Sequence, residues 1–172
     1  MVKNNQWVWL PLAAISTSVY ATSYFTVEQA QQAIFPGEKL APAFITLSDE
    51  QLLQFKKLSD GNVNGKEIKA WKTANGGWFF VDEVLGKHEQ ITFALALNAD
   101  GSIRQIEIMD YRESRGYEIR TPGWRKQFVG KTIRDPLQLN QDIGNISGAT
   151  LSCKHVTDGV KRLLAIYAVA LK

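Results

Sequence analysis

The sequence has few of the residues on which reactive sites are usually built. Of its 172 residues, one is cysteine and two are histidine. The single cysteine, Cys153, excludes an intramolecular disulfide and a metal site made of several cysteines. The histidines, His88 and His155, fall in an expected turn and an expected helix, and the chain has no Gly-x-Ser-x-Gly motif. The sequence therefore gives no support to an enzyme with a nucleophilic serine.

An excess of charge of one sign is also missing. The chain has 20 basic and 17 acidic residues, and removing the first 21 residues, whose only charged group is Lys3, leaves 19 basic residues. Nucleic-acid binding usually needs a clustered basic face, and we interpret the one local group of basic residues as solvated surface. That group is Arg112, Arg115, Arg120, Arg125, Lys126 and Lys131. We expect no nucleic acid among the partners.

Glycine motifs that bind nucleotides are missing as well. The chain has no Gly-x-Gly-x-x-Gly, so no NADH site is recognisable. The tripeptide "GKT" at 130–132 is not a phosphate loop, because the earlier glycine that such a loop needs would fall at Arg125.

The N-terminal residues read as a secretory signal. An apolar run, "WVWLPLAAISTSVYA", follows a basic residue, and Val19 and Ala21 suit the positions before a cleavage site. Cleavage of residues 1–21 would leave Thr22 as the mature start, and we expect an exported, periplasmic or otherwise extracytoplasmic protein. The alternative is an uncleaved anchor and membrane association, but the run is broken by Pro11 and is shorter than the roughly 20 residues that span a bilayer.

The remaining chain has the composition of a globular domain, with 45% hydrophobic and 22% charged residues. Two helices are expected early. Thr26 is the expected cap of a helix that ends at Phe35, before Pro36. Ser48 and Gln51 have the spacing of a capping box at the start of "SDEQLLQFKKL".

Strand patterns follow. The segments "KEIKAWKT", "GWFFVDEVL", "QITFALALN" and "SIRQIEIMD" alternate or run apolar, and "ANGG", "GKHE" and "ADG" separate them as tight turns. We predict an α+β fold: an antiparallel four-stranded meander packed by the N-terminal helices and a C-terminal amphipathic helix, with the helices on one side of the sheet.

The C-terminal helix has apolar residues at three- and four-residue spacing. These residues are Cys153, Val156, Val160, Leu163, Leu164, Tyr167 and Leu171. The polar residues Lys154, Asp158, Lys161 and Arg162 lie elsewhere on the helical wheel. Because Cys153 falls on the apolar stripe, we predict a buried, unreactive thiol.

Between the strands and this helix, "YRESRGYEIRTPGWRKQFVGKT" loses periodicity and reads as a loop with one short helix from Pro122 to Val129. The stretch "NISGATLS" then opens the C-terminal helix. The pattern alone favours Ser147 as a helix cap. It also makes a glycosylation sequon at Asn145, and a helix start with small residues suits a phosphate, which Thr150 could hold covalently.

"SGATLS" followed by "VTDGVKRLL" closely resembles the flavinylation motif of the FMN-binding domain family, which includes flavin-carrying subunits of Rnf-type and sodium-pumping NADH:quinone oxidoreductase complexes. In that family a flavin transferase moves FMN from FAD onto the motif threonine through a phosphodiester bond. The resemblance covers residues 65–172, after an N-terminal helical segment at 22–64. It implies covalent FMN on Thr150 and a binding role for the rest of the motif, which is Ser147, Gly148, Ala149, Leu151 and Ser152.

The resemblance extends to "YRESRGYEI", which is similar to a glutamate-containing, glycine-rich loop of the family. It assigns cofactor contacts to Glu113 and Gly116, and makes Tyr117 and Trp124 candidates to line the flavin ring. Arg115, Lys126 and Lys131 are candidates to meet the flavin phosphate or an acidic redox partner.

Two departures from the family pattern are visible. "ESRG" replaces the usual Glu-Thr-Pro-Gly, and Gly144 stands where the family usually has an aspartate three residues before Ser147. Asp142 is the nearest acidic residue that could serve instead. Non-covalent FMN is the alternative to attachment at Thr150.

The function that the resemblance implies is electron carriage, with no catalytic residue and no metal ligand. The expected partners are a flavin transferase for maturation and redox proteins, either membrane-bound or cytochromes. Two alternatives stay open: a flavin-free exported binding module, which would be colourless, and a flavin-dependent reductase, which would turn over an added acceptor. The missing NADH motif favours a carrier over an enzyme with its own substrate.

Overall fold

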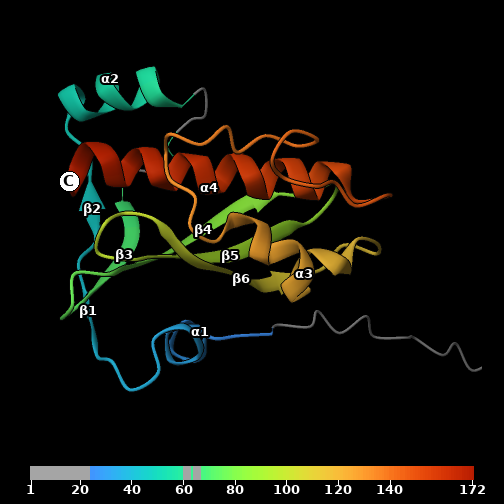
Figure 1. Cartoon of the computed structure of the whole chain (residues 1–172), viewed down its shortest axis with the longest axis horizontal. Coiled ribbons are helices and arrows are strands. Elements are labelled where there is room, and N and C mark those ends of the chain that lie inside the picture. Colours follow the sequence, from blue (N-terminus) through green and yellow to red (C-terminus); the bar gives the residue numbers. More distant parts are fainter. Residues whose placement is uncertain (1–23, 60–62, 64–66) are drawn as a thin grey trace, which may run out of the picture.

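The computed structural model describes residues 24–59, 63 and 67–172, so the predicted signal segment and its cleavage site lie outside the described residues. The described chain is an antiparallel sheet with helices on both faces (Figure 1). In chain order the elements are α1 (Val27–Ile34), β1 (Leu40–Pro42), β2 (Ile45–Thr46), α2 (Asp49–Leu58), β3 (Glu67–Thr73), β4 (Trp78–Leu85), β5 (Gln90–Leu97), β6 (Ile103–Tyr111), the 3-10 helix η1 (Tyr117–Arg120), α3 (Pro122–Arg125), the 3-10 helix η2 (Lys126–Phe128) and α4 (Thr150–Ala170). The predicted α+β class is confirmed.

The sheet contains the predicted meander. Its strand order is β1-β3-β4-β5-β6, with β2 pairing to β3 beside this path. The four expected strands are β3 to β6, and two further strands, β1 and β2, bring the total to six. With three and two residues, β1 and β2 are too short to produce a readable alternation, which is why the sequence pattern missed them.

One edge of the sheet, along β6, is partly occupied by other segments. The amides of residues 24–25 donate to Met109 O on β6. Residues 130–131 exchange backbone hydrogen bonds with Ile103, near the other end of the same strand. On the opposite edge, β1 ends at Pro42, which has no amide hydrogen to donate.

Apolar side chains lie on both faces of the central strands. Phe80 and Phe93 belong to a core shared with α4, whereas Phe79 belongs to a second core shared with Ala30 and Ile34 of α1. The prediction that the helices lie on one side was therefore wrong: α1 covers the face opposite α4 (Figure 1). The continuous apolar run in β4 explains this, since alternate side chains of a strand point to opposite faces and both faces then need cover.

The two early helices form as expected. Thr26 caps α1 and Ser48 caps α2, and each makes a reciprocal capping box with the glutamine three residues later. Helix α2 packs on the outer side of α4, where Phe55 is 1% exposed and Gln51 Nε2 donates to Val169 O at 3.3 Å. None of the helices in the described part of the chain has the length and hydropathy of a membrane-spanning segment.

Helix α4 lies close against the sheet. A Cβ added at Gly159 would lie 2.8 Å from Phe93 Cζ, so only glycine allows this approach without a shift. Cys153 is fully buried, as predicted, and its burial raises the pKa of the thiol. Arg162, which lies off the apolar stripe on the helical wheel, is nevertheless only 8% exposed and forms an ion pair with Asp82 at 2.6 Å.

The segment after β6 contains three short helices where one was predicted, because Thr121 and Pro122 break the run between η1 and α3. Arg125 fastens this segment to the sheet: it donates to Ile106 O at 3.0 Å and forms an ion pair with the buried Glu107. The basic group was interpreted as solvated surface, but Arg125, one of its members, contacts the sheet in the interior of the protein.

Candidate functional site

Helix α4 begins without a side-chain cap. Its first residue is Thr150, the N-cap position is Ala149, and no side chain in the described ranges caps it. The prediction that Ser147 caps the helix was wrong, because a turn closed by Ala149 N and Ile146 O at 3.0 Å moves the helix start beyond it. The amides of the first turn therefore have no side-chain acceptor, which leaves them and the positive end of the helix dipole open to an anion.

The hydroxyl of Thr150 lies at the surface beside a groove. Thr150 is exposed, and Asn145 Nδ2 donates to its Oγ1 at 3.0 Å. The groove has a volume of about 840 Å³ and runs between α4, the end of α2 and residues 136–140. Lys154, one turn further along α4, lines the same groove.

The glycine-rich loop packs directly on this helix start. Gly116 has a φ of +83°, and a Cβ there would lie 2.2 Å from Ala149 Cβ. The Tyr111 hydroxyl donates to Arg115 O at 2.5 Å and lies 3.3 Å from Ser152 Oγ, which is buried. Burial raises the pKa of Tyr111, so the phenol stays protonated and can donate. Two segments that the sequence assigned to one site are thus in contact.

Glu113 fastens the same loop to the turn between β4 and β5. Its Oε1 accepts hydrogen bonds from His88 N at 2.6 Å and Glu89 N at 3.1 Å. Although partial burial acts to raise the pKa of Glu113, these amide hydrogen bonds outweigh it and lower the pKa. The carboxylate therefore positions the loop, and its predicted contact with a flavin ring stays a prediction.

The two aromatic candidates differ in exposure. Tyr117, which follows Gly116, is 60% exposed and available to a planar ligand. Trp124 is 5% exposed, packs edge-on against Phe128, and donates from Nε1 to Gly144 O at 2.7 Å. Trp124 thus holds the backbone at Gly144, just before the motif, through a hydrogen bond from the protein interior.

Asp142, the acidic residue that could replace the missing family aspartate, already has partners for its carboxylate within residues 131–142. Its carboxylate accepts from Gln138 N at 2.8 Å and Leu137 N at 3.2 Å, and pairs with Lys131 at 2.9 Å. Partial burial acts to raise the pKa of Asp142, but the two amides and Lys131 lower it. The same pairing engages Lys131, one of the candidates to meet a phosphate; Arg115 and Lys126 are exposed.

Residues 86–165 match the family described as FMN-binding domain. These residues are therefore similar to an FMN-binding domain. The chain is also 27% identical over 140 residues to one subunit of the Na(+)-translocating ferredoxin:NAD(+) oxidoreductase complex of Acetobacterium woodii. That alignment covers 76% of this chain and 62% of the relative, so the chain spans less than two thirds of the relative's length. The resemblance stated from the sequence is confirmed.

The matched region includes both segments of the candidate site, the loop from Glu113 to Tyr117 and the motif around Thr150. The residues fit a phosphate-linked flavin. Thr150 offers an exposed hydroxyl at an uncapped helix start, and a Cβ at Gly148 would meet nothing within 4 Å, so space is open beside it. The adjoining groove is within the roughly 300–1,000 Å³ that small-molecule sites usually have.

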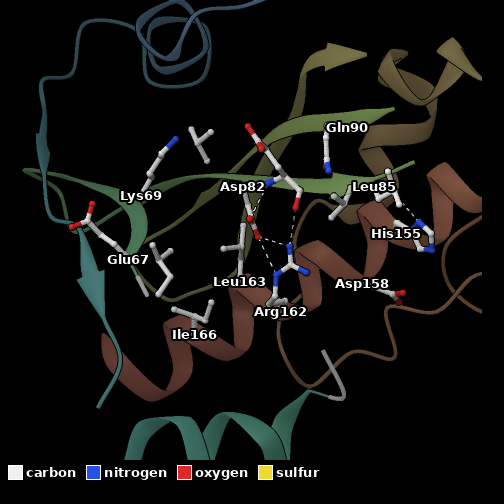
Figure 2. A pocket seen from close by; sticks show the side chains of 14 residues that line it. Glu67, Lys69, Asp82, Leu85, Gln90, His155, Asp158, Arg162, Leu163 and Ile166 are labelled. Carbon is white, nitrogen blue, oxygen red and sulfur yellow. Dashed lines mark hydrogen bonds and ion pairs between the residues drawn. The ribbon is translucent and has the colours of Figure 1, made fainter. Parts of the chain in front are cut away.

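A second cavity of about 670 Å³ lies between α4 and strands β3 and β4. Figure 2 shows the Arg162 guanidinium meeting the Asp82 carboxylate in this cavity, and His155 bonded to the backbone of Leu85. None of the residues described as lining it belongs to the predicted flavin site. No cluster of three or more metal-ligating side chains occurs among the residues with described positions.

Sequence reasoning missed three residues that organise the site. Tyr111 joins the loop to the motif, Gln127 accepts from Gly144 N at 2.6 Å, and Asn145 contacts Thr150. Asn145 stood out only as part of a sequon, and Tyr111 only as the first residue of the loop "YRESRGYEI". Gln127 gave no signal, because its contact depends on how α3 and η2 fold back.

Proposed function

We propose that this protein is an exported electron carrier that holds FMN through a phosphodiester bond to Thr150. The observation that carries the proposal is the exposed Thr150 hydroxyl at the uncapped start of α4, within an FMN-binding domain. When bound, FMN supplies the acceptance and release of one or two electrons. In this role Thr150 anchors the cofactor and takes no part in the redox chemistry.

The charges around Thr150 favour a phosphodiester there. The helix dipole places partial positive charge at the start of α4. Lys154 lies four residues beyond Thr150, hence on the same face of the helix. Its ammonium pairs with Asp158 at 2.6 Å, and both groups are more than half exposed, so Lys154 can turn toward a new anion at little cost.

Covalent attachment suits a protein that works outside the cytoplasm. A tethered cofactor keeps a high effective concentration at its site, where free FMN would be diluted away. We therefore include in the proposal a cleaved signal at residues 1–21, maturation by a flavin transferase, and redox protein partners that are membrane-bound or cytochromes. The relative named above, which belongs to an oxidoreductase complex, supports partners of this kind.

The intact mass of the exported protein, expressed with a flavin transferase, tests the proposal. We expect a mature start at Thr22 and a gain of about one FMN minus water that survives denaturation. Thr150→Val should abolish the gain, and Thr46→Val, at another exposed threonine, should leave it unchanged. A coloured native protein that loses flavin on denaturation would support non-covalent FMN, and a colourless protein would refute the carrier role.

A further inference from the structure

Asn145 is the side chain whose amide touches the Thr150 hydroxyl. Its Nδ2 donates to Thr150 Oγ1 at 3.0 Å, and its Oδ1 accepts from Ile146 N at 2.9 Å. The second contact fixes the orientation of the amide, because only the oxygen can accept from a backbone N–H. The NH₂ group must then face Thr150.

The backbone that carries Asn145 is held from both sides. Before it, Gly144 donates from its N to Gln127 Oε1 at 2.6 Å and accepts at its O from Trp124 Nε1 at 2.7 Å. After it, Ile146 O accepts from Ala149 N at 3.0 Å. The Asn145 side chain is thus presented to Thr150 by a braced segment.

We propose that Asn145 is a positioning residue for the modification of Thr150. By donating to Oγ1, Asn145 restricts rotation of the Thr150 side chain and leaves the hydroxyl hydrogen free to be removed from outside. This inference rests on the proposed covalent attachment. It assigns to Asn145 the task of presenting the acceptor hydroxyl in a chain that has Gly144, and not an acidic residue, beside it.

The reaction that Asn145 assists is a phosphoryl transfer with no change of oxidation state. Thr150 Oγ1 forms a bond to the phosphorus of the FMN half of FAD, and the phosphoanhydride bond to that phosphorus breaks. AMP leaves with the bridging oxygen, and the hydroxyl proton passes to a base of the transferase. Holding the attacking oxygen in one orientation lowers the entropy that must be lost to reach the transition state.

The test is the rate at which purified, unmodified protein gains FMN from FAD and a purified flavin transferase, followed by intact mass. We expect Asn145→Ala to lower the maximal rate about three- to tenfold, the effect of one hydrogen bond, with an unchanged KM for the protein. Asn145→Asp should lower the rate as well, because a carboxylate cannot donate to Oγ1 and would hold the hydroxyl hydrogen that Asn145 leaves free. Asn75→Ala is the matched control, since Asn75 makes a comparable exposed hydrogen bond to Glu38 at 3.2 Å.

The outcomes separate the positioning role from other effects. A wild-type rate for Asn145→Ala, while the wild type is modified, overturns the role of Asn145 and leaves the proposed function intact. A slower rate that arises only from a raised KM overturns it too, because it indicates impaired docking of the transferase. A wild-type protein that never gains FMN overturns the covalent attachment, and with it the role of Asn145.

Discussion

Replacing Gly116 by alanine tests whether contact between the glycine-rich loop and the start of α4 holds the site together. Two costs are expected. The left-handed backbone at Gly116, with φ of +83°, costs an alanine about 1–2 kcal/mol. The added Cβ would also lie 2.2 Å from Ala149 Cβ and 2.9 Å from the Tyr111 hydroxyl, and such overpacking costs about 1–3 kcal/mol.

Gly130→Ala separates these two costs. Gly130 has a φ of +80°, but a Cβ there would meet nothing within 4 Å, so it reports the backbone cost alone. We expect Gly116→Ala to lower the free energy of unfolding by about 2–5 kcal/mol and Gly130→Ala by about 1–2 kcal/mol. Urea denaturation followed by tryptophan fluorescence measures both values, provided that the slope with denaturant is the same.

A double variant identifies the partner in the clash. Ala149→Gly alone should be nearly neutral, because glycine is tolerated at an N-cap position. Combined with Gly116→Ala, it removes Ala149 Cβ, the atom with which the new Cβ would clash. The double variant should therefore regain part of the lost stability, with a coupling energy of about 0.5–3 kcal/mol. If Gly116→Ala costs no more than Gly130→Ala, or if Ala149→Gly restores nothing, the reasoning from this contact is wrong.

Two further predictions concern charged groups beside α4. Arg162→Met should lower the free energy of unfolding by about 3–5 kcal/mol, because it removes the ion-pair partner of the mostly buried Asp82 carboxylate; adding Asp82→Asn should recover part of this loss in thermal unfolding, and no recovery would argue against the ion pair as the cause. Asp142, whose pKa is lowered in the folded protein, stabilises the fold above the ordinary carboxylate pKa of 3.8, and this contribution is lost as pH falls through its folded pKa. Asp142→Asn should therefore be less stable than the wild type at pH 7, and the difference in their free energies of unfolding should decrease below about pH 4. Urea titrations across a pH series measure this difference. If it stays constant, the contacts of Asp142 with Lys131 and the two amides are not its origin.

Local signals in the sequence were sufficient for the longer helices and strands and insufficient for their contacts. The caps at Thr26 and Ser48 and the alternation in β3 to β6 depend on neighbouring residues, and the structure has them where they were predicted. The start of α4 follows a turn closed by Ala149 N and Ile146 O, and Gly116 from a distant segment packs against this turn, whereas the pattern pointed wrongly to Ser147 as the cap.

The same distinction applies to charged side chains. Glu113 reads as a ligand-binding residue in a loop, yet its carboxylate accepts two amides of a turn that no local pattern links to it. Arg162 falls on the polar side of a helical wheel, but packing of α4 on the sheet buries it against Asp82. The residue types therefore indicated which segments form the candidate site. The tertiary structure determined which of their polar groups already have hydrogen-bond or ion-pair partners within the protein.

The two edges of the sheet limit how other chains can attach. A strand with free amides and carbonyls is a template on which a second chain can add a strand. Segments 24–25 and 130–131 already use the outward groups of β6 at Met109 and Ile103, and β1 ends in Pro42. Sheet extension from one molecule to the next is disfavoured at these points, which protects the domain from aggregation by strand addition. A protein that docks at these points of β6 is expected to recognise side chains and their charges, so its recognition can be changed by surface substitutions that leave the sheet intact.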